Sequence, residues 1–115
     1  MDRAAVNAFC QRLPGSEWSD PWGGGHDVWK VGGKMYACMG TADTGVSLKS
    51  ADIETAGLLI EMGRAERAPY FHRSWVHLPW SLVDGDEMAE RIVTSYGIVR
   101  GGLTKKAQAA LGDWP

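Results

Sequence analysis

Apolar residues recur along the chain first with helical spacing and then with strand spacing. The first pattern predicts a helix over residues 2–13, which Pro14 and Gly15 end. Residues 16–25 then predict a short strand followed by a glycine-rich bend. The apolar positions of the helix follow the i, i+3, i+4, i+7 spacing of a single face: Val6, Phe9, Cys10 and Leu13.

A β-hairpin is the clearest local prediction. Two alternating runs, residues 27–31 and 34–38, flank Gly32-Gly33, and glycine adopts at no steric cost the positive φ that such a two-residue loop needs. Because side chains alternate along a strand, one face of the hairpin should carry Trp29 and Tyr36. The turn also sets three opposite pairs: Val31–Lys34, Lys30–Met35 and Trp29–Tyr36.

The rest of the chain predicts one more strand of this meander and then a mainly helical half. The third strand covers residues 45–49, with Val46 and Leu48 on one face. Apolar residues at helical spacing mark the longest later helix: Met88, Ile92, Tyr96 and Val99. A helix from Asp52 to Met62 comes first, followed by a loop over 64–73 and a strand over 74–78. Pro79 either ends this strand or marks it as an edge strand. The last expected elements are a helix from a capping box at Asp84 to Gly101-Gly102 and a short helix capped by Thr104.

This order predicts an α+β fold. Strands that come as hairpins, with helices gathered toward the ends, favour a two-layer sandwich in which helices pack on one face of an antiparallel sheet. The 115 residues, 44% hydrophobic and 23% charged, suit a single globular domain over residues 1–115. Strands and helices do not alternate as βαβ units, which argues against a nucleotide-binding parallel sheet.

The charge balance is nearly neutral but uneven. Twelve Lys and Arg stand against fourteen Asp and Glu, a net charge of −2, while residues 91–112 contain basic residues and no acid. That stretch fits either a solvated helix surface or a phosphate contact. Lys105 and Lys106 fall in the first turn of the last helix, where positive charge opposes the helix dipole. A phosphate contact would explain them, and so would long stems that cover apolar surface.

The two cysteines and the absence of targeting patterns indicate a reducing cytoplasm. Cys10 and Cys38 form no CxxC pair, and Cys10 lies on an apolar helix stripe, as a buried free thiol would. The chain opens with Asp2 and Arg3 and no apolar run follows, so a signal peptide is not expected. No stretch approaches the ~20 apolar residues of a membrane span, so we expect no membrane partner.

We expect no catalytic, metal or cofactor site. His26, His72 and His77 lack the spacing of metal ligands. Ser47 lies within a string that begins like GxSxG, but Lys49 stands where the second glycine belongs. The Ser95 hydroxyl is expected to bond back to a carbonyl of its own helix.

Several longer strings, taken in order, resemble the MmcQ/YjbR family. They run through nearly the whole chain: residues 26–36 (HDVWKVGGKMY), 46–49 (VSLK), 68–70 (APY), 75–76 (WV), 95–96 (SY) with Val99, and 102–106 (GLTKK). The resemblance implies a YjbR-like α+β domain similar to double-wing DNA-binding folds, with no known catalytic residue or cofactor. The run His72 to Trp75 departs from the family, because it has one arginine where relatives often place two or more basic residues.

Two non-enzymatic functions follow from the resemblance and the residues together. The first is weak DNA binding, or a regulatory role, with phosphate contacts from the matching basic residues: Lys30, Lys34, Lys49, Arg73, Lys105 and Lys106. The second is a module that binds a protein or a small ligand on the aromatic side of the sheet, through Trp29, Tyr36 and Trp75. Core packing or a dimer contact would explain these aromatic residues equally well.

Overall fold

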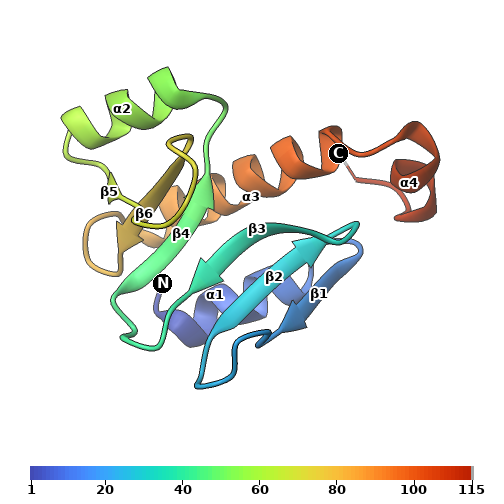
Figure 1. Ribbon diagram of the computed structural model, residues 1–115, viewed down its shortest axis with the longest axis horizontal. Coiled ribbons are helices and arrows are strands. Elements are labelled where there is room, and N and C mark those ends of the chain that lie inside the picture. The colour runs from blue at the N-terminus through green and yellow to red at the C-terminus, as the bar shows by residue number, and fades with distance from the viewer. Residues whose placement is uncertain (115) are drawn as a thin grey trace.

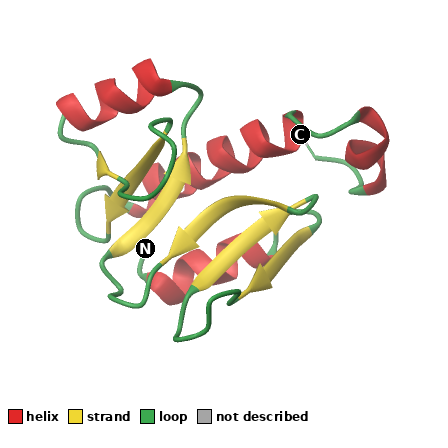
Figure 2. Ribbon diagram, in the orientation of Figure 1, coloured by secondary structure: helices red, strands yellow, loops and turns green. Residues whose placement is uncertain are grey.

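A six-stranded antiparallel sheet runs through the computed structural model, which describes residues 1–114 (Figure 1). The strands lie in the order β1-β2-β3-β4-β6-β5, and four helices complete the predicted α+β fold (Figure 2). The elements are α1 (Arg3–Gln11), β1 (Ser16–Ser19), β2 (Asp27–Val31), β3 (Lys34–Met39), β4 (Gly45–Lys49), α2 (Ile53–Glu61), β5 (Glu66–Arg67), β6 (Trp75–Pro79), α3 (Gly85–Gly101) and α4 (Lys105–Ala110).

The helices pack on one face of the sheet, as predicted. α1 and α3 lie behind the strands in Figure 1, and α2 flanks β6 and β5. No helix of residues 1–114 covers the opposite face, called the open face below. Because side chains alternate along strands, the outward pairs on the open face are Lys30–Met35, Cys38–Ser47, Ser47–His77 and Lys49–Trp75. No described helix is long and apolar enough to span a membrane.

Local capping signals account for where the helices begin. Each helix starts after a residue whose side chain accepts a hydrogen bond from a backbone N–H three residues later, which satisfies a donor the helix cannot pair itself. The predicted caps Asp52, Asp84 and Thr104 are confirmed, and Asp2 caps α1 in the same way.

The predicted hairpin forms, but part of the predicted register is wrong. Gly32 and Gly33 sit at the tip with φ of 58° and 80°, and Val31–Lys34 and Lys30–Met35 are opposite pairs. Trp29 lies opposite Ala37 rather than Tyr36, because a β-bulge between Trp29 and Lys30 shifts the register. The extra residue in β3 lets Tyr36 and Ala37 both join the core, where each is fully buried.

The expected loop over residues 64–73 contains a short strand. Glu66 and Arg67 of β5 pair with His77 and Val76, so β6 is an inner strand between β4 and β5. Pro79 is the last residue of β6, as one predicted alternative has it, whereas the alternative of an edge strand is wrong because β5 pairs with β6 on its outer side. Two residues carry too weak a periodic signal for a strand, and the neighbouring strand supplies the pairing that forms it.

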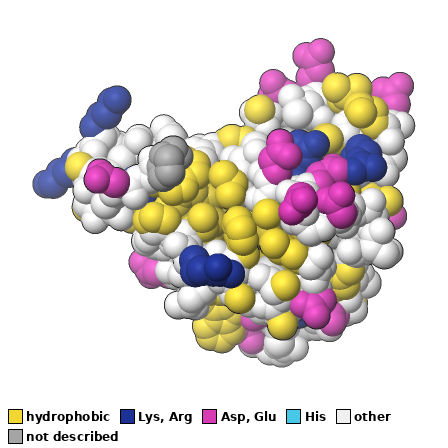
Figure 3. Space-filling model, turned by 180° about the vertical axis from the view of Figure 1, so that it is seen from behind, with side chains coloured by type: hydrophobic (Ala, Val, Ile, Leu, Met, Phe, Trp, Pro, Cys, Tyr) yellow, Lys and Arg dark blue, Asp and Glu magenta, His cyan; other side chains and the backbone are white. Residues whose placement is uncertain are grey.

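The helices at the two ends of the molecule, α4 and α2, carry charged side chains of opposite sign. Acidic and basic side chains both lie near the α2 end (Figure 3). α4 projects at one end and contains Lys105 and Lys106 with no acid. α2 lies at the other end and contains Glu54 and Glu61 with no base. Acidic side chains gather around apolar ones at this second end.

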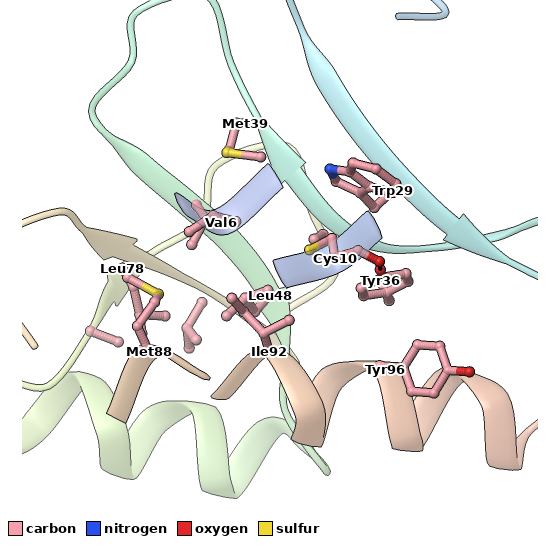
Figure 4. Packing of buried hydrophobic residues seen from close by; sticks show 14 of the residues in the cluster. Val6, Cys10, Trp29, Tyr36, Met39, Leu48, Leu78, Met88, Ile92 and Tyr96 are labelled. Carbon is pink, nitrogen blue, oxygen red and sulfur yellow. Dashed lines mark hydrogen bonds between the residues drawn. The ribbon is translucent and has the colours of Figure 1, made fainter. Parts of the chain in front are cut away.

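The core fills the space between the helices and the sheet (Figure 4). Tyr36 from β3 and Tyr96 from α3 meet edge to face, with ring centroids 5.3 Å apart. Burial raises the pKa of the Cys10 thiol to about 12, so Cys10 stays protonated. The predicted stripe of α3 is buried in this core: Met88, Ile92, Tyr96 and Val99.

Candidate functional site

The expected basic residues divide into separate groups. Lys30 and Lys49 project from the open face with β3 between their strands, and Arg73 lies in the turn before β6. Lys34 lies at the hairpin tip opposite Val31, which faces the helices. Lys105 and Lys106 are exposed on α4, beyond the far end of α3 (Figure 1). The fold therefore brings Lys49 and Arg73 to one place and keeps the α4 lysines away from it.

The three aromatic residues proposed for a pocket do not share one surface. Trp29 and Tyr36 are core residues, because their rings fill the space between the sheet and α1 and α3. Trp75 lies on the open face and stacks on Phe71 with ring centroids 4.8 Å apart. The expectation of one pocket from Trp29, Tyr36 and Trp75 is therefore corrected.

Tyr70 is the most exposed large side chain in the loop that leads into β6. Its ring is fully exposed, and its backbone has φ of 73°. This left-handed conformation is unusual for a bulky residue, and such strain persists only where the surroundings hold it. Ala68 is buried on one side of Tyr70, and Phe71 is stacked on Trp75 on the other. An aromatic ring displayed to solvent from an anchored loop is typical of a contact residue.

A hydrogen-bonded chain joins this loop to β4. The Lys49 ammonium donates to the Ser74 hydroxyl at 3.0 Å, and the Ser74 hydroxyl lies 2.8 Å from Nδ1 of His72. The Ser50 backbone N–H donates to the Ser74 carbonyl at 2.8 Å. These bonds hold Lys49 beside the loop that carries Tyr70 and Arg73. We call this region the β4–β6 surface: Lys49, Tyr70, Phe71, His72, Arg73, Ser74, Trp75 and His77.

Ser47 and His77 form a second polar pair on the same face. The Ser47 hydroxyl lies 3.1 Å from Nδ1 of His77, and the Thr44 hydroxyl lies 3.2 Å from Nε2. Burial lowers the pKa of His77 against the opposing influence of Glu66, so the imidazole is neutral at neutral pH. A serine beside a neutral histidine can act as nucleophile and base, but here a hydroxyl occupies the ring nitrogen that a carboxylate would orient. The pairing of β4 with β6 by itself places Ser47 opposite His77, so their hydrogen bond is explained without a catalytic role.

Sequence reasoning missed both Tyr70 and the Ser47–His77 pair. Tyr70 lies within the string 68–70 that carried the family resemblance, and its positive φ depends on the folded loop. Ser47 and His77 are 30 residues apart, and only the pairing of β4 with β6 brings them together. Among residues 1–114, no three His, Cys, Asp or Glu side chains are grouped as a metal site would require.

The family model described as YjbR matches residues 11–98, which include the whole β4–β6 surface. The chain belongs to the YjbR family. YjbR is not known as a family of enzymes. The match contains Lys30, Lys34, Lys49 and Arg73, whereas Lys105 and Lys106 lie beyond its end.

A solved structure has the same fold as this YjbR chain. It is the crystal structure of Deinococcus radiodurans protein DR2400, described as having a DUF419 domain. The two chains are 25% identical, the likeness covers 97% of this chain and 89% of that one, and the TM-score is 0.85. No curated protein matches the sequence.

Proposed function

We propose that this YjbR protein binds nucleic acid without catalysis, through phosphate contacts and base stacking on the β4–β6 surface. The observation that carries the proposal is the fully exposed ring of Tyr70, held at φ of 73° in the same loop as Arg73, and the ammonium of Lys49 is hydrogen-bonded to Ser74 at the end of that loop. Exposed aromatic rings next to cations are the usual means of binding single strands, because every base has a face that can stack. Cytoplasmic placement belongs to the same proposal and is supported by the free buried thiols of Cys10 and Cys38.

Binding of this kind should be weak and sensitive to salt. The net charge of −2 leaves only local positive charge to attract phosphates, so dissociation constants of ~10⁻⁴–10⁻⁶ M are expected. The β4–β6 surface presents a loop and strand ends rather than a recognition helix. We therefore expect little base-specific readout and a preference for unpaired over duplex DNA.

The test is a fluorescence-anisotropy titration with labelled single-stranded and duplex DNA of about 20 nucleotides, at about 50 and about 200 mM salt. Replacing both Lys49 and Arg73 by Ala should reduce the salt slope by about one to two. Tyr70→Gly should weaken single-strand binding by about 5- to 160-fold, since stacking is worth ~1–3 kcal/mol per base. Glycine adopts φ of 73° freely, so this variant keeps or gains stability while it loses the ring.

The matched control replaces Lys105 and Lys106 by Ala. These lysines are exposed in the first turn of α4, so the fold should survive their loss, which also relieves the conflict with the helix dipole. Unchanged binding by this variant supports the β4–β6 surface. Loss of binding only in this variant would move the interface to α4, and no binding at low salt would overturn nucleic-acid binding altogether.

A shallow hollow between α1 and the first strands favours a second candidate, a module for a flat apolar ligand. The half-exposed ring of Trp18 lies beside Trp29, with Asn7, Ala8 and Gln11 of α1 completing the lining. The Asn7 side-chain oxygen accepts from the Trp29 indole N–H at 2.8 Å, which fixes both groups. Ligand-induced quenching of tryptophan fluorescence that is lost in Trp18→Ala would support this candidate.

A further inference from the structure

α2 leaves an unusual amount of apolar side chain in solvent. Among the described residues, four of the seven exposed large hydrophobic side chains lie on α2 or at its end: Ile53, Leu58, Ile60 and Met62, at 47%, 54%, 38% and 61% exposure. Single exposed apolar residues are ordinary on protein surfaces, whereas a cluster on one short helix marks an interaction site.

A small apolar pocket opens between α2 and α3. Its floor is the helix face of β4 and β6, where Leu48, Val76 and Leu78 are buried. Leu59 and Thr55 form the wall on the α2 side, and Arg91 and Thr94 form the wall on the α3 side. A mostly apolar pocket with polar residues at its walls suits one aliphatic side chain.

Helix geometry places two of the exposed residues at the edge of this pocket. Successive helix residues turn by ~100°, so Thr55, Met62 and Leu58 follow Leu59 in order around one side of α2. Leu58 and Met62 are one turn apart and thus extend the apolar wall outward from the pocket. Ile53 and Ile60 lie on the opposite side of the buried stripe. We call the pocket together with Leu58 and Met62 the α2–α3 groove.

The borders of the α2–α3 groove are acidic. Glu54 and Glu61 on α2, and Glu90 on α3, lie within ion-pair distance of no Lys or Arg of residues 1–114. Of the three arginines at this end, Arg64 and Arg91 both pair with Glu87, and Arg67 of β5 forms no ion pair within residues 1–114. Figure 3 shows acidic side chains around the apolar ones at this end of the molecule. A partner that covers the groove must therefore bring positive charge to its rim.

We propose that the α2–α3 groove docks a basic amphipathic helix of a partner protein. An aliphatic side chain of that helix fills the pocket, and the next apolar residue on the same face covers Leu58 and Met62. Lysines or arginines flanking the apolar face lie against Glu54, Glu61 and Glu90. The pocket shares Lys49 with the β4–β6 surface, but its apolar walls come from α2 and α3, and the proposal does not depend on nucleic-acid binding.

Two synthetic helices of about 14 residues test the proposal, one with leucines at i, i+3, i+4, i+7 and lysines elsewhere, and one with the same leucines and glutamates. Calorimetric titration of the full chain measures the affinity of each peptide, and ¹H–¹⁵N spectra show where on the chain the peptide binds. We expect the basic peptide to bind at least about tenfold more tightly and to shift the amides of Leu58, Leu59, Met62 and Thr94.

Matched variants separate this site from a general attraction between charges. Replacing Leu58 and Met62 by Lys should weaken binding of the basic peptide by at least about tenfold. The control replaces Ile53 and Ile60 by Lys, which adds the same charge to the other side of α2. This control should bind the basic peptide more tightly than the variant with lysines at positions 58 and 62. Equal loss in both variants, or equal binding of the two peptides, overturns the proposal. The proposal is also overturned if the wild-type chain self-associates in sedimentation experiments and the double variant Leu58→Lys with Met62→Lys does not. The groove would then be covered by a second copy of the chain.

Discussion

The hydroxyl of Ser95 on α3 donates a hydrogen bond to the backbone carbonyl of Tyr36 on β3, 2.6 Å away. The same oxygen accepts from the backbone N–H of Lys49 on β4 at 2.9 Å. The β3–β4 register continued by one residue would pair Tyr36 with Lys49, and the Ser95 hydroxyl bridges them there. A helix side chain thus continues the ladder between two strands, and it does not bond within its own helix as expected.

Replacing Ser95 by Ala should lower the free energy of unfolding by about 1–3 kcal/mol. The change leaves the Tyr36 carbonyl and the Lys49 N–H without their partner in a buried position. Urea denaturation measures the effect. Thr94→Ala is the control, because Thr94 is the adjacent, exposed hydroxyl on α3, and it should change stability by no more than about 0.5 kcal/mol.

At Gly45 the backbone of β6 leaves no room for a side chain on β4. A Cβ atom at this position would overlap the backbone carbonyl of Leu78, which cannot move without disturbing the strand pair. We expect Gly45→Ala to cost at least about 2 kcal/mol of stability. Gly40→Ala is the control, since a Cβ there meets no atom within 4 Å, and thermal denaturation compares the two. Equal melting temperatures would contradict the close approach.

His77 should make stability depend on pH near neutrality. Burial lowers its pKa below the ordinary 6.5, so the unfolded chain takes up the proton more readily than the folded one. The resulting stability is present above pH ~6.5 and is lost as pH falls through the folded pKa. Urea denaturation should therefore give a lower free energy of unfolding at about pH 5.5 than at about pH 7.5. This difference should be smaller in His77→Gln. The exposed His72 provides the control, and His72→Gln should keep the wild-type fall.

Asp27 ties α1 and β1 to β2. Burial would raise its pKa, but hydrogen bonds from Arg3, Asn7 and Trp18 outweigh that effect and hold the pKa below 3.8. We expect Asp27→Asn to cost about 1–3 kcal/mol at neutral pH.

The acid limb of the stability profile supplies a second measurement. A carboxyl group whose pKa is lower in the folded than in the unfolded chain stabilises the fold above pH ~3.8. This stability is lost as the pH falls through the folded pKa. Asp27→Asn should therefore be less sensitive to acid than wild type. Asp86→Asn removes an exposed charge in the first turn of α3 and should shift stability by no more than about 0.5 kcal/mol.

The sequence by itself determined the helix starts, the hairpin turn and the third strand. The caps Asp52, Asp84 and Thr104 each bond a backbone N–H three residues on, and Gly32-Gly33 needs only its own positive φ. Signals of this kind lie within a few residues, so they can be read along the chain.

Tertiary structure alone decided the β-bulge, β5 and the composition of the candidate surfaces. Trp29 and Tyr36 became core residues because α1 and α3 cover their face of the sheet, a choice that alternation along the strand leaves open. Ser47 meets His77 across 30 residues and Ser95 meets Tyr36 across 59. Such contacts depend on which strands pair and which helix crosses them, and the burial that selects those pairings is a property of the whole fold.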